Sequence, residues 1–137
     1  MRMRKTLTNP ERGAVTTFFA VLAVSFLMTV GLVVDGGRKL GALAEVRDLA
    51  DNAARTCAQA VNATQYRASG TPTINPTEGA GRAHNYLAAT GATGSVTVTD
   101  VTCTVTVTKT VNTTFLPLSS TVHATESAST FDGVTGP

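Results

Sequence analysis

The sequence predicts an α+β protein in which a long N-terminal transmembrane helix continues into an amphipathic stalk packed against a small antiparallel sheet of about three strands. Three observations predict this fold class. They are an uncharged apolar stretch near the N-terminus, a helical repeat of small apolar residues after it, and an alternation of Val and Thr further on. The chain has 137 residues, which is room for one domain and an anchor.

The composition argues against several classes of protein. The net charge is only +2, and the chain has no Trp, five Phe and two Tyr. Several of its 11 Lys and Arg residues flank the apolar stretch, whereas a nucleic-acid binder presents a basic face. Few bulky side chains remain for a wide core or a ligand pocket. We therefore expect no nucleic acid, no small-molecule substrate, no cofactor and no enzymatic activity.

The apolar stretch at residues 14–34 is long enough to cross a membrane. As a helix it spans about 31 Å at 1.5 Å per residue, close to the hydrocarbon thickness of a bilayer. A buried core helix is the alternative interpretation. However, the remainder of the chain offers too few large apolar residues to surround it. The sequence therefore predicts a transmembrane helix at 14–34, with the lipid bilayer as its partner.

Flanking charge predicts the orientation of this helix. Four basic residues precede it and two follow within its next turns: Arg2, Arg4, Lys5, Arg12, then Arg38 and Lys39. The positive-inside rule then places residues 1–13 in the cytoplasm and the C-terminal part outside. A cleaved secretory signal is the alternative. The stretch exceeds the usual signal length and no A-x-A-like site follows, so we expect an uncleaved single-pass anchor in the cell membrane.

Beyond the anchor, residues 35–66 have the pattern of an amphipathic stalk helix. Apolar residues recur at helical spacing up to Val61: Leu40, Leu43, Val46, Leu49, Ala50, Ala53, Ala54, Cys57, Ala58 and Val61. The opposite face is polar, and Asp51 and Arg55 are spaced for an i,i+4 ion pair. Gly36-Gly37 lies between anchor and stalk. Because two glycines weaken a helix, the sequence leaves open whether the helix is continuous or broken there.

A small extracytoplasmic α+β domain is predicted at residues 67–131. A loop at 67–79 leads into a short helix at about 78–89. From Ser95 to Phe115 Val alternates with Thr, and the alternation changes parity near Thr99-Asp100. Such a change requires a turn or bulge between strands. A third, weaker strand follows at 121–130, with the Val face toward the stalk and the Thr face toward water. The tail, 132–137, is expected to be unstructured.

The two cysteines point to one interface. Cys57 falls on the apolar stripe of the stalk, and Cys103 on the Val face of the predicted strands. In an oxidising compartment they should form a disulfide, and two buried free thiols are the alternative. His84 and His123 are not clustered with other ligands, so we expect solvated surface histidines and no metal or catalytic site.

Residues near the outer end of the anchor suit contact with other helices. Gly37 and Gly41 form a small-xxx-small pair of the kind that permits close helix packing in membranes. Asp35 lies at the boundary, where a carboxylate needs water or a cation nearby. Arg38 is three residues on and could pair with it inside the helix, or a partner helix could supply the cation. We predict that Asp35, Gly37, Arg38 and Gly41 form a helix-packing surface.

The N-terminal half also resembles a known family. The resemblance rests on three motifs: Arg12-Gly13-Ala14 before the apolar run, Asp35-Gly36-Gly37-Arg38 after it, and an Ala-rich helix with Asp48 and Asp51. This layout resembles the pseudopilin-like TadE/TadG proteins of bacterial tight-adherence (Flp-type) pilus assembly. The resemblance implies a membrane-anchored structural or assembly component whose transmembrane and stalk helix contacts other membrane or pilus-assembly proteins. The alternative function is an anchored extracytoplasmic binding module outside any appendage.

Gly13 and Ala14 align with the peptidase site of the pilin-like members of this family. Those members carry a Glu at the fifth residue after the cleavage point, where this chain has Phe18. We therefore expect the chain to escape prepilin processing and to keep its N-terminus at or near Met1.

Overall fold

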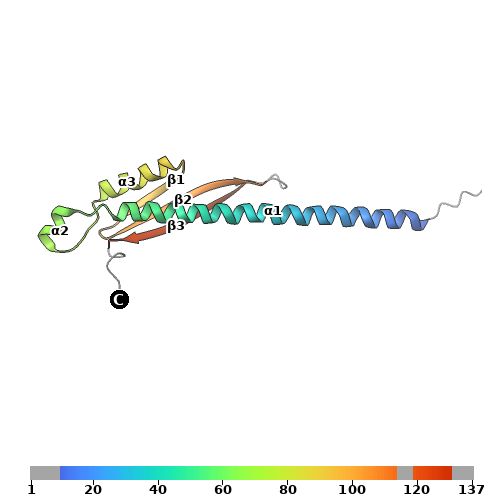
Figure 1. The fold of residues 1–137 in the computed structure, drawn as a ribbon, viewed down its shortest axis with the longest axis horizontal. Helices are drawn as coiled ribbons and strands as arrows, with labels where there is room; N and C mark the ends of the chain where they lie inside the picture. The colour runs from blue at the N-terminus through green and yellow to red at the C-terminus, as the bar shows by residue number, and fades with distance from the viewer. Residues whose placement is uncertain (1–9, 114–118, 131–137) are drawn as a thin grey trace, which may run out of the picture.

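Helix α1 (Pro10–Ala58) is a rod that carries the other elements at one end (Figure 1). The computed structural model describes residues 10–113 and 119–130, so the first nine residues and the tail at 132–137 lie outside the described residues. The 49 residues of α1 correspond to about 73 Å at 1.5 Å per residue. The helix runs through Gly36-Gly37 without a break, which resolves the question that the sequence left open.

The end of α1 differs from the prediction. The stalk was expected over 35–66, with its stripe reaching Val61, but α1 ends at Ala58. The backbone of the next residues pairs with a distant segment instead. Asn62 N donates to Thr73 O at 2.8 Å, Asn75 N donates to Ala60 O at 2.8 Å, and Val61 bridges Ile74. These bonds take the place of further helical turns.

A second correction concerns the predicted loop at 67–79. Helix α2 (Ala63–Ser69) overlaps its beginning. Asn62 caps this helix, since its side chain accepts a hydrogen bond from Gln65 N at 3.1 Å. Gly70 then ends it in the left-handed region at φ 72°, which a glycine adopts without strain. α2 buries none of its residues, so no apolar period marked it in the sequence.

Helix α3 (Pro76–Ala89) is the short helix expected at about 78–89, and it begins two residues earlier. Asn75 caps it by accepting a hydrogen bond from Glu78 N at 3.3 Å, and Pro76 occupies its first turn. Proline suits this position because the first N–H groups of a helix have no intrahelical partner. Gly79, Ala83 and Leu87 form its buried side.

Three strands form one antiparallel sheet in the order β1-β2-β3. They are β1 (Thr93–Val98), β2 (Thr102–Asn112) and β3 (Ser119–Ser129). A tight turn joins the first two, with Thr99 N donating to Thr102 O at 2.8 Å. This turn accounts for the parity change near Thr99-Asp100. The expected third strand is present and begins at Ser119.

The sheet packs one face on a helical layer formed by α1 and α3 (Figure 1). Along β2, Cys103, Val105 and Val107 are buried against this layer, whereas Thr108 and Thr110 are exposed. The predicted division between a Val face and a Thr face is therefore confirmed. The core members of α1 are small: Val46, Ala50, Ala53, Ala54, Cys57 and Ala58. Small side chains let the backbone of the helix lie close to the strands.

Strand β2 runs back along α1 toward its apolar half. Cys103 lies beside Cys57, and Lys109 lies beside Glu45. The two separations agree, because six strand residues span roughly 20 Å and twelve helix residues span about 18 Å. By the same rises, Asn112 reaches the level of about residue 37 of α1. The domain therefore begins where the apolar stretch ends, with no linker between them.

Candidate assembly interface

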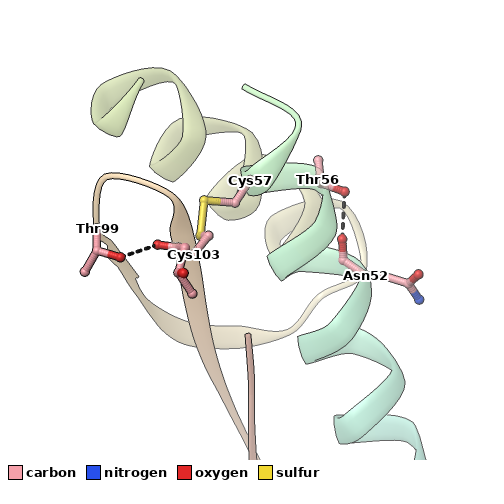
Figure 2. Close-up of a disulfide and its surroundings, with 6 residues drawn as sticks. Asn52, Thr56, Cys57, Thr99 and Cys103 are labelled. Carbon is pink, nitrogen blue, oxygen red and sulfur yellow. Dashed lines mark hydrogen bonds between the residues drawn. A yellow bond between two sulfur atoms is a disulfide. The ribbon is translucent and has the colours of Figure 1, made fainter. Parts of the chain in front are cut away.

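A disulfide joins the distal end of α1 to the start of β2. The two sulfurs of Cys57 and Cys103 are 2.01 Å apart and the Cα atoms 6.1 Å apart. Both residues are fully buried. Figure 2 shows the bond spanning the gap between helix and sheet, beside the turn that contains Thr99. The predicted Cys57–Cys103 bond is confirmed, and it closes a loop with a sequence separation of 46.

Helix α3 packs directly on this bond at Gly79. A Cβ placed on Gly79 would lie 2.9 Å from Ile74 Cγ2 and 3.1 Å from both Cys57 O and Cys57 Sγ. Real Cβ contacts are not that short, so only glycine fits without a shift of its neighbours. Sequence reasoning missed this role. The signal available in the sequence was a glycine inside a predicted helix. A glycine that does not interrupt its helix often marks a close packing contact.

The N-terminal half of α1 leaves large apolar side chains uncovered. The exposed ones between Gly13 and Asp35 are Val15, Phe18, Phe19, Val21, Leu22, Val24, Phe26, Leu27, Met28, Val30, Leu32, Val33 and Val34. The most apolar 18-residue window of this helix has a mean hydropathy of 2.4, and 6% of it is buried. Within the described part of the chain, α1 is the one helix long and apolar enough to cross a membrane.

Three hydroxyl groups in this apolar half are satisfied within the helix. Thr17 Oγ1 donates to Gly13 O at 2.8 Å, Ser25 Oγ to Val21 O at 2.8 Å, and Thr29 Oγ1 to Ser25 O at 2.9 Å. Each is a bond to the carbonyl four residues earlier. In hydrocarbon an unpaired hydroxyl costs several kcal/mol. These polar side chains are therefore compatible with lipid on all sides.

The four residues expected to form a helix-packing surface lie on two different sides of α1. Asp35 is 3% exposed, whereas Gly37, Arg38 and Gly41 are exposed. At about 100° per residue, Gly37 points about 160° and Gly41 about 120° away from Asp35, whereas Arg38 lies about 60° from it. Asp35 instead continues the buried stripe of Ala42, Val46 and Ala53, near the level at which β2 ends at Asn112.

Gly37 and Gly41 form an open patch. A Cβ on either residue would have no neighbour within 4 Å. The two are four residues apart and so share one face of the helix. Gly13 and Ala14, the residues of the prospective peptidase site, are also exposed and lie in the first turns of α1.

The remaining candidates from the sequence stand apart from one another. His84 and His123 are exposed, on α3 and β3 respectively, as expected. Among residues 10–113 and 119–130, no group of three or more His, Cys, Asp or Glu could hold a metal ion. The expected pair on the stalk is present, with Arg55 Nε 2.9 Å from Asp51 Oδ2.

Together, the uncovered apolar half of α1 and the small disulfide-bonded domain fixed to its other half define a protein with one candidate membrane-spanning helix and an attached α+β domain. Residues 13–60 of the chain match the family model described as "Putative Flp pilus-assembly TadE/G-like". This match confirms the resemblance seen in the sequence. It covers α1 from Gly13 onward, including Asp35 and Cys57, and ends before the sheet. No curated protein and no solved structure matches the chain.

Proposed function

We propose that the chain is a membrane-anchored structural or assembly component of a Flp-type pilus apparatus, with a cytoplasmic N-terminus and an extracytoplasmic disulfide-bonded domain. One observation carries the proposal. The segment that matches the pilus-assembly family is the same helix whose apolar half is uncovered and whose other half packs under the sheet. The chain acts by holding and presenting, not by catalysis.

Insertion of α1 in a bilayer gives its apolar half the cover that the domain does not provide. Residues 14–34 match the hydrocarbon thickness, and the hydroxyls of Thr17, Ser25 and Thr29 are bonded to the backbone of the same helix. Burying one exposed Phe, Leu or Val is worth about 1.5–3 kcal/mol. With twelve such side chains and Met28 exposed between Gly13 and Asp35, water is a poor environment for this half of the helix.

The proposed orientation rests on two features. Basic residues concentrate before the apolar stretch, which favours a cytoplasmic N-terminus. The Cys57–Cys103 bond belongs to an oxidising compartment, which is the side opposite to the cytoplasm. Protease added to intact spheroplasts should therefore digest the domain. Protection of the domain until lysis would refute this orientation.

The Gly37/Gly41 patch is the proposed contact with another transmembrane helix of the apparatus. It is open, small and placed at the outer end of the anchor. Gly37→Leu combined with Gly41→Leu should abolish cross-linking to membrane partners, because leucines prevent close helix approach. Insertion and the disulfide should remain. Arg47→Leu is the control, since it adds a leucine at an exposed position on a different face of α1.

Surface piliation tests the function as a whole. Deletion of the gene should remove pili from the cell surface in electron micrographs, and expression of the full chain should restore them. Normal piliation after deletion would contradict the proposal. The alternative function, an anchored binding module outside any appendage, would then remain. In that case the Gly37/Gly41 double variant should give the same yield of cross-links as the parent chain.

A further inference from the structure

Strand β3 has a free edge. It pairs with β2 on one side, and no described strand pairs with its other side. The direction of its backbone groups follows from the register. Thr130 N donates to Val101 O at 2.9 Å, so even-numbered residues of β3 direct their backbone toward β2. In an antiparallel pair the alternate residues face the other way. The N–H and C=O groups of Thr121, His123, Thr125 and Ser127 therefore point outward.

This edge lacks most of the devices that usually protect edge strands from pairing. Such strands are commonly short, carry Lys or Pro, or contain a bulge. β3 has 11 residues and contains neither Lys nor Pro. Its register with β2 is unbroken from Thr102↔Ser129 to Asn112↔Ser119. Its one formally charged side chain, Glu126, is opposite Val105 and so lies on the helix-facing side, where an inward-pointing charge gives the edge partial protection.

A hollow of about 550 Å³ adjoins the distal end of this edge. The last turn of α1 and the residues after it form one wall, and the end of β3 forms the other. The lining has three kinds of residue: the charged Asp51 and Arg55, the polar Gln59, Ser127, Ser129 and Thr130, and the apolar Ala58, Val61 and Ala128. The two charges neutralise each other in an ion pair of 2.9 Å, and more of the surface that the lining exposes is apolar than polar. The hollow therefore suits an uncharged, bulky apolar side chain.

We propose that an extended segment of a partner polypeptide adds to β3 as a fourth strand and places a bulky apolar side chain in this hollow. Strand addition of this kind draws affinity from main-chain hydrogen bonds and specificity from pockets for alternate side chains. β3 offers both the main-chain groups and the pocket. Its outward backbone groups line the edge, and the hollow lies beside that edge on the face of the sheet that packs against the helices. The inference rests on the outer domain and does not require the pilus assignment.

A second copy of the chain fits this edge less well. Consider two copies whose α1 helices lie side by side and point the same way. If their β3 strands pair, the two copies are related by a two-fold rotation about an axis parallel to the strands. That rotation turns the open face of one copy toward the helix side of the other. A two-fold axis along the strands leaves each residue at its own height, so the side chains offered to the hollow would be Ser127 and Ser129 of the second copy. Both are small and polar, and neither supplies the bulky apolar group that a hollow of about 550 Å³ can accept.

Proline at an outward-facing position tests the edge selectively. His123 is exposed, and its N–H points away from β2, so His123→Pro removes a donor that the sheet does not use. Proline is tolerated at such positions of edge strands. His123→Ala is the matched control because it removes the same imidazole and keeps the N–H. Formation of the Cys57–Cys103 bond in the full-length membrane protein verifies the fold of each variant.

Photo-cross-linking in cells reports occupancy of the edge. p-Benzoylphenylalanine is placed at Ser127, on the edge, or at Thr104, which pairs with Ser127 but lies inside the sheet on its open face. An adduct is expected from Ser127 and not from Thr104, joined to a partner segment that alternates apolar and polar residues. His123→Pro should reduce it roughly fivefold or more, the factor for one lost hydrogen bond, and His123→Ala should not.

Gln59→Trp provides a second test that leaves the backbone of β3 unchanged. Gln59 is exposed and lines the hollow, so tryptophan there should occupy part of it, compete with the partner's side chain and lower the yield of the Ser127 adduct. This variant decides the matter if His123→Pro fails to form the disulfide. Equal adducts from Ser127 and Thr104, an adduct with a second copy, or adducts unaffected by the folded variants would each overturn the proposal. Normal piliation with such a result would leave the pilus assignment standing.

Discussion

Lys109 Nζ donates to Glu45 Oε1 across 2.6 Å and joins two residues that are 64 positions apart. The pair lies on the same side of the sheet as the Cys57–Cys103 bond, nearer to the apolar half of α1. These two links fix β2 against the helix at two levels. They differ in kind, because the ion pair is largely open to water and the disulfide is fully buried.

Loss of the Lys109–Glu45 pair should have a small effect on stability. The side chains are 44% and 53% exposed, and exposed ion pairs typically contribute about 0.2–1 kcal/mol. A double-mutant cycle with Lys109→Met and Glu45→Gln should give a coupling energy in that range, measured by chemical unfolding in detergent. The coupling should decrease as salt is raised. A coupling above this range that is insensitive to salt would show that the pair is shielded from water.

Loss of the disulfide should have a much larger effect. The bond closes a loop with a separation of 46 residues, for which the loop-entropy estimate is about 4 kcal/mol. Cys57→Ala with Cys103→Ala should lower the free energy of unfolding by roughly that amount. Each single variant should be at least as unstable, since it removes the bond and leaves a buried thiol. A double variant that unfolds at the same denaturant concentration as the parent would contradict this expectation.

Two glycines of α3 should respond in opposite ways to alanine. At Gly79 a new Cβ would meet Ile74 and Cys57 at 2.9–3.1 Å, so Gly79→Ala should destabilise the domain through overpacking, by about 1–3 kcal/mol. At Gly81 a Cβ meets nothing within 4 Å, so Gly81→Ala should stabilise through helix propensity, by up to about 1 kcal/mol. Thermal melts of both variants provide the comparison. Equal shifts of the same sign would contradict the close packing at Gly79.

The cap of α3 offers a second matched pair. Asn75 Oδ1 accepts a hydrogen bond from Glu78 N, and replacement of an N-cap Asn by Ala costs about 0.5–2 kcal/mol. Asn85 lies in the interior of the same helix and is exposed, so Asn85→Ala should be neutral or slightly stabilising. Amide hydrogen exchange in the first turn of α3 should accelerate in Asn75→Ala alone. Equal acceleration in both variants would exclude a specific cap.

The parts of the fold set by local pattern could be predicted. The alternation of Val and Thr indicated the strands, and its parity change located the turn at Thr99–Thr102. The positions of Cys57 and Cys103 on two apolar faces indicated their bond, because both faces had to be buried against each other. These features depend on the period of side chains along an element, which the sequence displays directly.

The parts set by distant contacts could not be predicted. The end of α1 at Ala58 depends on backbone pairing with Thr73 and Asn75, and no side-chain pattern records such pairing. The burial of Asp35 likewise depends on tertiary structure. Its position in the helix continues the stripe of Ala42 and Val46, but the sequence shows no reason for the domain to reach so far down the helix. The sequence therefore predicted Asp35 as a residue at the membrane boundary and not as one that faces the domain.

The unbroken course of α1 through Gly36-Gly37 leaves the molecule without a joint between its apolar half and its domain. A continuous helix couples a displacement of one end to the other end. If α1 moves along its axis by one helical turn, the sheet moves by about 5.4 Å. If a partner contacts α1 one residue further along, the sheet is rotated by about 100° relative to that partner. A contact that holds the N-terminal half of α1 thus fixes two properties of the β3 edge. They are its height above the membrane and its rotational orientation about the axis of α1.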